Sequence, residues 1–303
     1  MTAPPIVWHP DYMAPLQPGH RFPMSKYGYL RRALDMRGLL PAGGFLAPAP
    51  APVALLSAVH DIGYVERVET GRLSADETRR IGLPNTPAVA RRARLAAAGT
   101  LLAARLAMEH GIACNAAGGS HHAGPDVGSG FCVYNDVAIA ARALLVEGIV
   151  RRVLIVDLDV HQGDGTAWIF AGDPAVFTLS LHGAKNFPAR KATSSLDIPL
   201  ADATGDAEYL AALQIALGRA IREARADIAF YNAGVDVWEG DRLGRLALSR
   251  EGLRARERLA LSMLRAAGLP VACVLGGGYS NEPEELAARH AMVFEEAAAL
   301  NGA

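Results

Sequence analysis

Four ionisable side chains follow a single apolar run in VLIVDLDVHQGDGTAWIF, residues 153–170: Asp157, Asp159, His161 and Asp164. Side chains alternate between the two faces of a strand, so the first three share one face if the strand continues through them. Carboxylates packed this closely repel one another unless a cation compensates their charge. Because carboxylate and imidazole groups without a thiolate suit zinc, manganese or iron, this segment predicts a metal site.

A third ligand is expected from another part of the chain, because a catalytic zinc site uses about three protein ligands and keeps one position open. Asp159 and His161 supply two ligands. Asp236 in YNAGVDVW follows a second apolar run, and Gly234 before it allows the backbone to approach closely. Asp236 is therefore the predicted third ligand.

Two adjacent histidines, His121 and His122, lie in the glycine-rich stretch GGSHHAGPDVGSGFCVYND, residues 118–136. Beside a predicted metal site, such histidines are either further ligands or groups that transfer protons. Asp157 and Asp164 are the carboxylates left over from the metal, and each could hold the outer nitrogen of one histidine. A carboxylate in that position fixes the tautomer of the imidazole and raises its basicity.

The stretch VLGGGYS, residues 274–280, is rich enough in glycine to be considered as a phosphate-binding loop. No GK[ST] follows it, and the next helical segment begins with Glu282, Glu284 and Glu285. These charges would repel a phosphate, whereas a phosphate-binding loop attracts one. The alternative interpretation is that the glycines let the backbone approach the site and present the hydroxyl of Tyr279.

The elements that would position these motifs are short apolar runs that alternate with helical patterns. The runs begin at positions 153, 175, 227 and 270, and helical patterns cover residues 87–110, 208–225 and 250–267. This alternation predicts an α/β fold with a parallel sheet covered by helices on both faces. Sites in such sheets collect beyond the carboxyl ends of the strands, so we expect the motifs that end three of these runs to converge.

Composition excludes several other classes of protein. The 303 residues are 51% hydrophobic, and 30 basic residues balance 31 acidic ones, so no nucleic-acid or membrane partner is expected. No apolar run approaches the ~20 residues of a membrane span, and the first residues do not resemble a signal peptide, which predicts a cytoplasmic protein. Three scattered cysteines without a CxxC pair indicate neither disulfides nor a thiolate zinc site. The arginines at 91, 92, 94 and 105 are expected on a solvated helix face.

Taken in order, GGSHHAG, GFCVYND, VDLDVHQGDG, LSLH, AGVD and LGGGY resemble the zinc-dependent histone deacetylase superfamily. The stretches HPDYMAPLQPGHRFPMSKY and NFPARK are most similar to its bacterial and class IV members. The resemblance covers nearly the whole chain. It implies one arginase-like, deacetylase-like catalytic domain over residues 1–303, with a parallel sheet flanked by helices on both faces.

The resemblance also implies roles for individual residues. One zinc ion would be bound by Asp159, His161 and Asp236. His121 would pair with Asp157, and His122 with Asp164 as general base and acid, while Tyr279 would donate to the oxyanion. The substrate tunnel would be formed by Phe131, Phe187, Gly130 and Gly277. A structural monovalent cation, usually potassium, would be held around Asp157, Asp159, His161, Ser180 and Leu181.

The activity implied by the resemblance is hydrolytic removal of acetyl or longer acyl groups from lysine side chains of a protein or peptide. An acetylpolyamine amidohydrolase, which shares the machinery, is an alternative. An arginase-like hydrolase with two metals is disfavoured, because Gly163 and Trp238 stand where further ligands are needed. An inactive module that binds acyl-lysine is a third alternative. Ser120 stands where class I enzymes have tryptophan, and no oligomeric state is predicted.

Overall fold

A seven-stranded sheet runs through the centre of the molecule, and every pair of neighbouring strands is parallel. The computed structural model describes residues 3–41 and 43–301. Across the sheet the order of strands is β1-β2-β7-β6-β3-β4-β5. The strands are β1 (Ile6–Val7), β2 (Ile112–Asn115), β3 (Val153–Asp157), β4 (Val176–Gly183), β5 (Leu196–Leu200), β6 (Ile228–Ala233) and β7 (Val271–Leu275).

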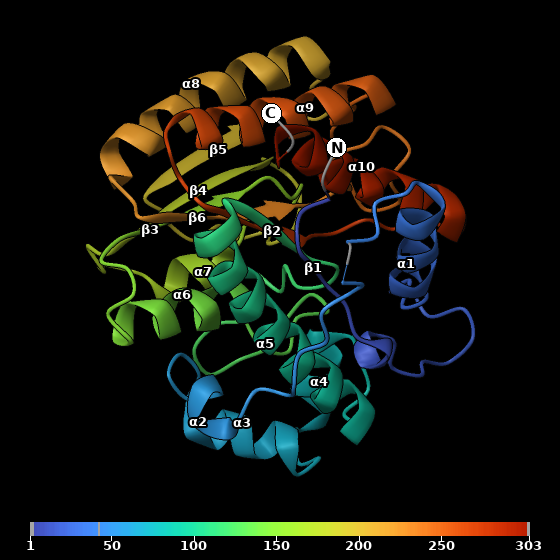
Figure 1. Cartoon of the computed structure of the whole chain (residues 1–303). Coiled ribbons are helices and arrows are strands. Elements are labelled where there is room, and N and C mark those ends of the chain that lie inside the picture. The colour runs from blue at the N-terminus through green and yellow to red at the C-terminus, as the bar shows by residue number, and fades with distance from the viewer. Residues whose placement is uncertain (1–2, 42, 302–303) are drawn as a thin grey trace.

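Helices cover both faces of this sheet (Figure 1). The helices α8, α9 and α10 lie over one face, with α1 beside α10, whereas α5, α6 and α7 lie over the other face. The helices are α1 (Lys26–Met36), α2 (Val53–Leu56), α3 (Ile62–Glu69), α4 (Ala75–Ile81), α5 (Pro87–His110), α6 (Asp136–Val146), α7 (Asp164–Ile169), α8 (Asp206–Ala224), α9 (Arg250–Ala266) and α10 (Pro283–Asn301), with a short 3-10 helix, η1 (Pro10–Tyr12). The predicted α/β fold class is therefore confirmed.

Alternation along the buried strands divides the core into two layers. In β3, Val153 and Ile155 pack with α5 and α6, while Leu154 and Val156 point to the layer that includes α8, α9 and α10. All five residues of β3 are buried. A strand buried on both faces has no polar position to alternate with, which explains why its sequence is a continuous apolar run.

Local sequence signals fix the start of α5, the longest helix. The hydroxyl of Thr86 accepts a hydrogen bond from the backbone N–H of Val89, and Pro87 occupies the first turn of α5. The prediction of a helix over residues 87–110 is confirmed. The prediction that its arginines lie on a solvated face is wrong for Arg92, which is buried and donates to the carbonyl of Tyr12. Buried donors and acceptors satisfy one another there.

The order of strands explains where the chemistry gathers. Four consecutive strands, β2, β7, β6 and β3, are followed by the four motifs that carry histidine, aspartate or glycine-rich sequence. After β3 the chain builds outward through β4 and β5, and then returns to add β6 on the other side of β3. This reversal opens a crevice at the carboxyl ends of β3 and β6, the usual place for a site in such sheets. Within the described ranges, no helix combines the length and apolar character that crossing a membrane requires.

Candidate active site

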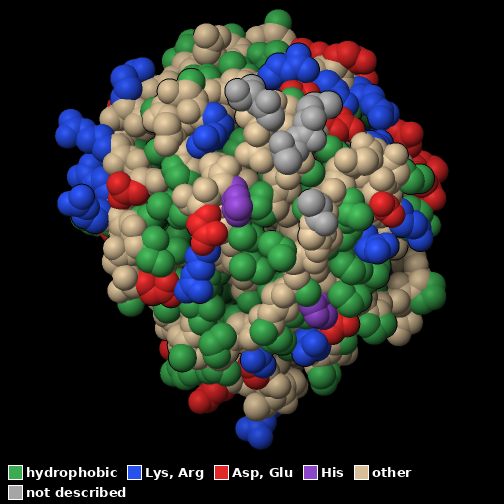
Figure 2. Space-filling view, viewed as in Figure 1, with side chains coloured by type: hydrophobic (Ala, Val, Ile, Leu, Met, Phe, Trp, Pro, Cys, Tyr) green, Lys and Arg blue, Asp and Glu red, His purple; other side chains and the backbone are tan. Residues whose placement is uncertain are grey.

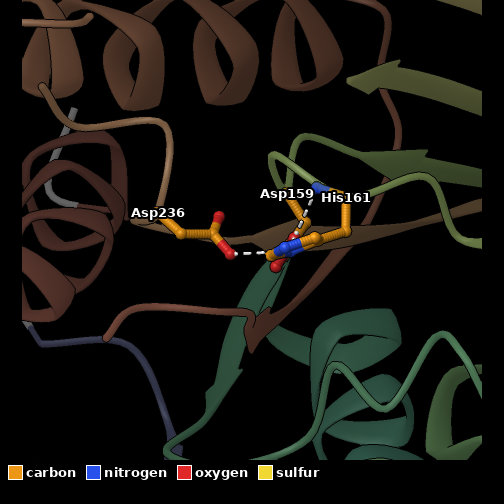
Figure 3. Close-up of side chains that lie close together, drawn as sticks. All are labelled: Asp159, His161 and Asp236. Atoms are coloured by element: carbon orange, nitrogen blue, oxygen red, sulfur yellow. Dashed lines mark hydrogen bonds and ion pairs between the residues drawn. The ribbon is translucent and has the colours of Figure 1, made fainter. Parts of the chain in front are cut away.

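The three predicted metal ligands come together at the carboxyl ends of β3 and β6 (Figure 3). Asp159 and His161 lie just after β3, and Asp236 lies just after β6. Nδ1 of His161 is 2.9 Å from Oδ1 of Asp159 and 3.1 Å from Oδ2 of Asp236. One potential ligand atom from each residue lies within 4.8 Å of the others, and all three residues are buried.

The two buried carboxylates beside His161 favour a positive charge between them. Burial and the charge of Asp159 raise the pKa of Asp236 above its usual value. Burial would lower the pKa of His161, but the two carboxylates raise it to about 10. Oδ2 of Asp236 accepts no well-oriented hydrogen bond from the described part of the chain. Two buried carboxylates and one imidazole, without a thiolate, are a donor set that fits a divalent transition-metal ion.

Each of the adjacent histidines is held by its own carboxylate. Nδ1 of His121 lies 2.6 Å from Oδ2 of Asp157, and Nδ1 of His122 lies 2.6 Å from Oδ1 of Asp164. The two imidazole rings are 4.1 Å apart, centre to centre. Because Nδ1 of each ring donates to a carboxylate, Nε2 of each ring takes no part in these two hydrogen bonds.

The same two histidines differ in their affinity for protons. Burial would lower the pKa of His121, but the charges of Asp157 and Asp159 raise it to about 9. Burial and the charge of His121 lower the pKa of His122 to about 4. Neighbouring groups with pKa values driven apart suit separate roles as acid and base. The pKa of His122 therefore lies below that of His121, which favours the neutral imidazole at this position.

Supporting contacts orient these dyads, and sequence reasoning missed them. Nδ2 of the buried Asn232 donates to Oδ1 of Asp157 at 2.9 Å. The buried carboxylate of Asp136 accepts from the backbone N–H groups of Gly119 and Ser120 at 3.2 and 2.7 Å. Both residues stand inside the motifs YNAGVD and GFCVYND, but their spacing alone does not show what they contact.

The glycine-rich turn after β7 lies against the ligands. The backbone N–H of Gly277 donates to Oδ2 of Asp159 at 2.5 Å, and a Cβ atom at residue 277 would overlap Oδ2 of Asp236. Only glycine allows an approach this close. Gly277, which was predicted to line the substrate tunnel, lies against the carboxylates and lines a small cavity of about 30 Å³ that also contacts Gly130 and Phe131. That cavity has room for one or two water molecules.

Tyr279 follows this turn and is 8% exposed. Its ring stands edge-on to the ring of His161, with centroids 6.2 Å apart. Its backbone N–H donates to Oδ2 of Asp241 at 2.7 Å, which fixes the direction of the turn. The interpretation that the glycines present a tyrosine, in place of a phosphate-binding loop, is consistent with this position.

A pocket of about 670 Å³ leads from the surface to His122, His161 and Tyr279. Phe131, Phe187 and Gly130, three of the four residues predicted to form a substrate tunnel, line this pocket. The ring of Phe187 stands edge-on to that of His122 at 4.9 Å, and Phe187 is 45% exposed at the rim. Phe131 has a φ of 68°, a left-handed conformation that is uncommon for a bulky residue and is typical of functional sites.

Hydrogen bonds to α4 hold this unusual backbone in place. The N–H of Gly130 donates to the carbonyl of Arg80 at 3.1 Å, and the N–H of Phe131 donates to the carbonyl of Ile81 at 2.6 Å. A Cβ at Gly82, which ends the helix with a φ of 73°, would meet the ring of Phe131. The last turn of α4 and one wall of the pocket therefore form one unit.

The residues predicted to hold a monovalent cation are also neighbours. Asp157 of β3 stands opposite Ser180 of β4 in the parallel register, and Leu181 follows Ser180. Ser180 and Leu181 are both buried. The hydroxyl of Ser180 lies 3.0 Å from Nδ1 of His182.

The parallel sheet brings a candidate metal centre and two His–Asp pairs to the floor of one pocket. This combination of fold and site defines a class of hydrolase. Residues 20–296 match the family model of the histone deacetylase domain. The chain belongs to the histone deacetylase family.

Individual relatives agree with this membership. An uncharacterized protein of Picosynechococcus sp. is 48% identical over 97% of this chain and 98% of its own length. Histone deacetylase 2 of Arabidopsis thaliana is 31% identical over 86% of this chain and 70% of its own length. The acetoin utilization protein AcuC of Staphylococcus aureus is 31% identical over 75% of this chain and 64% of its own length.

The fold is also found in a solved structure. The crystal structure of the HDA15 HD domain superposes with a TM-score of 0.82 at 22% sequence identity. The match covers 98% of this chain and 88% of that chain.

Proposed function

We propose that this protein is a zinc-dependent amidohydrolase that removes acetyl or related acyl groups from lysine side chains. One observation carries the proposal. The group formed by Asp159, His161 and Asp236 lies beside the His122–Asp164 pair on the floor of a pocket with aromatic walls. Such a pocket accepts an extended aliphatic chain and leads its amide to the polar floor. The names of the deacetylase relatives support the same reaction class.

Asp159, His161 and Asp236 would hold one zinc ion. When bound, the ion would polarise the acyl carbonyl and make a water molecule more acidic. Gly163 and Trp238 offer no ligand for a second metal, which argues against a dinuclear, arginase-like site. We also assign Asp157, Asp159, His161, Ser180 and Leu181 to a structural potassium ion.

His122 would move the proton. As the neutral imidazole, its Nε2 takes a proton from the attacking water while the new C–O bond forms. The same nitrogen then returns the proton to the lysine nitrogen as the amide C–N bond breaks, so that a carboxylic acid and a free amine leave. Asp164 keeps the imidazole in the tautomer with Nδ1 protonated and stabilises the imidazolium.

Tyr279 and His121 would act on developing charge. The hydroxyl of Tyr279 would donate a hydrogen bond to the carbonyl oxygen as negative charge accumulates on it. His121, held at Nδ1 by Asp157, would stabilise charge that develops beside it. A pocket that excludes bulk water makes both interactions stronger.

The test is turnover of peptides that carry one acyl-lysine with acyl chains of increasing length, with acetylspermidine alongside. The metal content of the protein is measured on the same preparation. We expect release of the free lysine peptide by zinc-loaded protein and loss of that release in His122→Ala. His110→Ala, which removes a histidine at the end of α5, is the control and should retain activity. Peptide binding without turnover by zinc-loaded protein would instead indicate an inactive binding module.

A further inference from the structure

Basic side chains surround the mouth of the pocket. The residues that line the pocket include five cationic side chains and no aspartate or glutamate: Arg21, Arg79, Arg80, Lys185 and Arg245. All five are exposed. They come from separate segments, namely the loop before α1, the end of α4, the loop after β4 and the loop after β6. The fold brings them together, because no two of these segments are adjacent in the sequence.

Few carboxylates offset these charges. Arg79 pairs with Asp76, while Lys185 and Arg245 both approach Asp202, at 3.6 and 3.3 Å. Arg21 and Arg80 take part in none of the ion pairs formed within residues 3–41 and 43–301. Because these five cations have ion-pair partners in only two carboxylates among the described residues, positive charge predominates among the side chains that line the mouth.

This excess is not a general property of the surface. The whole chain has a net charge of −1. On the face shown in Figure 2, acidic and basic side chains are interspersed among apolar and uncharged ones. A charge excess confined to the rim of a cleft acts on whatever enters the cleft, because the low-dielectric walls focus the field.

We infer that this protein acts on acyl-lysine residues flanked by acidic residues. The inference rests on the proposed function, because it describes which acyl-lysine reaches that floor. The aromatic walls contact only the uncharged side chain, so the residues beside the acyl-lysine lie against Arg21, Arg80 and their neighbours. Acidic flanks are attracted there, whereas basic flanks are repelled.

The same charges disfavour other ligands of the pocket. An acetylpolyamine carries ammonium groups a few bonds from its acetyl group, so its cations would stand among those of the mouth. A peptide rich in lysine and arginine meets the same repulsion. A nucleic acid would be attracted, but it offers no aliphatic amide to enter the pocket, so an acidic polypeptide is the partner that fits both the rim and the floor.

The backbone at the end of α4, which forms part of the mouth, is hydrogen-bonded to the wall of the pocket. The carbonyls of Arg80 and Ile81 accept the hydrogen bonds that hold Gly130 and Phe131. The backbone that carries Arg80 is therefore fixed relative to the wall of the pocket. Contacts made by a preorganised surface lose less entropy than contacts made by a mobile loop.

The experiment compares three peptides that share one acetyl-lysine and carry aspartate and glutamate, neutral, or lysine and arginine flanks. At low salt, kcat/KM should be about 10-fold or more higher for acidic than for basic flanks, since each exposed ion pair contributes only a factor of about two to five. High salt should shrink this ratio, because it screens exposed charges. The ratio should approach one or reverse in Arg21→Glu/Arg80→Glu. Arg151→Glu/Arg222→Glu changes the net charge equally but away from the pocket, and should leave the ratio unchanged.

The outcomes separate the inference from the proposed function. Equal turnover of all three peptides, or faster turnover of the basic one, would overturn the inference and leave the deacylase function intact. No turnover of any peptide by zinc-loaded protein would refute the function, and the inference with it. An oligonucleotide and an acidic peptide that lacks acyl-lysine are also compared as inhibitors of the turnover of the neutral peptide. Stronger inhibition by the oligonucleotide would assign the mouth to nucleic acid and overturn the inference.

Discussion

The guanidinium of Arg256 lies 2.5 Å from the carbonyl oxygen of Gly234, two residues before Asp236. The same nitrogen donates to the carbonyl of Leu158 at 3.1 Å, next to Asp159. Arg256 belongs to α9, is fully buried and pairs with Glu257. One side chain therefore ties together the two strand ends that carry the candidate metal ligands.

Arg256→Met should weaken both the fold and the metal site. It leaves the carboxylate of Glu257 buried without its cation, which costs about 3–5 kcal/mol of unfolding free energy. Arg256→Met/Glu257→Gln removes that unpaired charge, so stability should recover in part. The two carbonyls still lack their donor, so zinc affinity should stay about 10–100-fold below wild type. Denaturant unfolding and zinc titration measure the two effects separately.

Arg258→Met is the matched control, because Arg258 lies on the same helix but is largely exposed and pairs with Glu296. It should change neither stability nor zinc affinity appreciably. If the double variant regained wild-type zinc affinity together with its stability, Arg256 would be a core residue without influence on the ligands.

Removal of the metal should abolish hydrolysis, and added zinc should restore it. Asp159→Asn should lose bound metal as well as rate, because a neutral amide replaces one of two anionic ligands. Metal content and the zinc-induced rise in melting temperature are read alongside activity, since an ion that binds only the folded state stabilises it. Asp173→Asn, which alters a carboxylate paired with Arg142 away from the site, is the control. Full activity of metal-free protein would refute the metal assignment.

His122→Ala should keep the metal but lose about 10²–10⁴ in kcat, the usual contribution of a positioned acid–base group. Asp164→Asn should lower the rate through the same histidine, because an amide cannot stabilise the imidazolium in the way a carboxylate does. Metal content distinguishes the roles left open by the sequence. A metal-free His122→Ala protein would mean that His122 is a ligand and not the base.

Gly277→Ala should displace the metal ligands. The added methyl group would overlap Oδ2 of Asp236 and stand 2.8 Å from Oδ2 of Asp159, so one or both carboxylates must move. We expect a clear loss of zinc affinity, measured by titration. Gly205→Ala is the control, because the nearest atom to its new Cβ is the carbonyl oxygen of Ala247 at 3.9 Å. Unchanged zinc binding in Gly277→Ala would show that the turn yields without cost to the site.

Sequence periodicity predicted the elements that are long or fully apolar. The runs beginning at 153, 175, 227 and 270 correspond to β3, β4, β6 and β7, each starting within one residue of the prediction. Three strands gave no such signal. β1 has two residues, β2 has four, and β5 contains Pro199 on the edge of the sheet, where a missing N–H is tolerated. Such strands are identified by their pairing with neighbouring strands in the fold, and not by their own sequence pattern.

The candidate site was predictable where the chemistry is local and unpredictable where distant segments meet. Asp157, Asp159 and His161 share a short segment, so strand geometry indicates their proximity. Arg256 stands in an ordinary amphipathic pattern, and its acceptors are 98 and 22 residues away in sequence. From the sequence alone, Gly277 is only a residue with backbone freedom, and the fold shows that carboxylates lie against it. The roles assigned to these residues remain predictions that the variants test.

Tyr279→Phe separates two roles for a tyrosine that is almost buried. Phenylalanine keeps the ring that packs near Phe131 and His161, so folding and metal content should not change. If the hydroxyl donates to the oxyanion, kcat should fall about 10²–10³-fold, or ~2.7–4 kcal/mol of transition-state stabilisation. KM should change less, because the hydrogen bond strengthens only as charge develops on the carbonyl oxygen.

The measurement is kcat and KM on one acyl-lysine peptide for wild type and Tyr279→Phe, with zinc quantified in each. Tyr29→Phe, on α1, is the control for loss of a hydroxyl elsewhere. Equal kcat in wild type and Tyr279→Phe would leave Tyr279 a packing residue, and the metal would then have to stabilise the oxyanion without it.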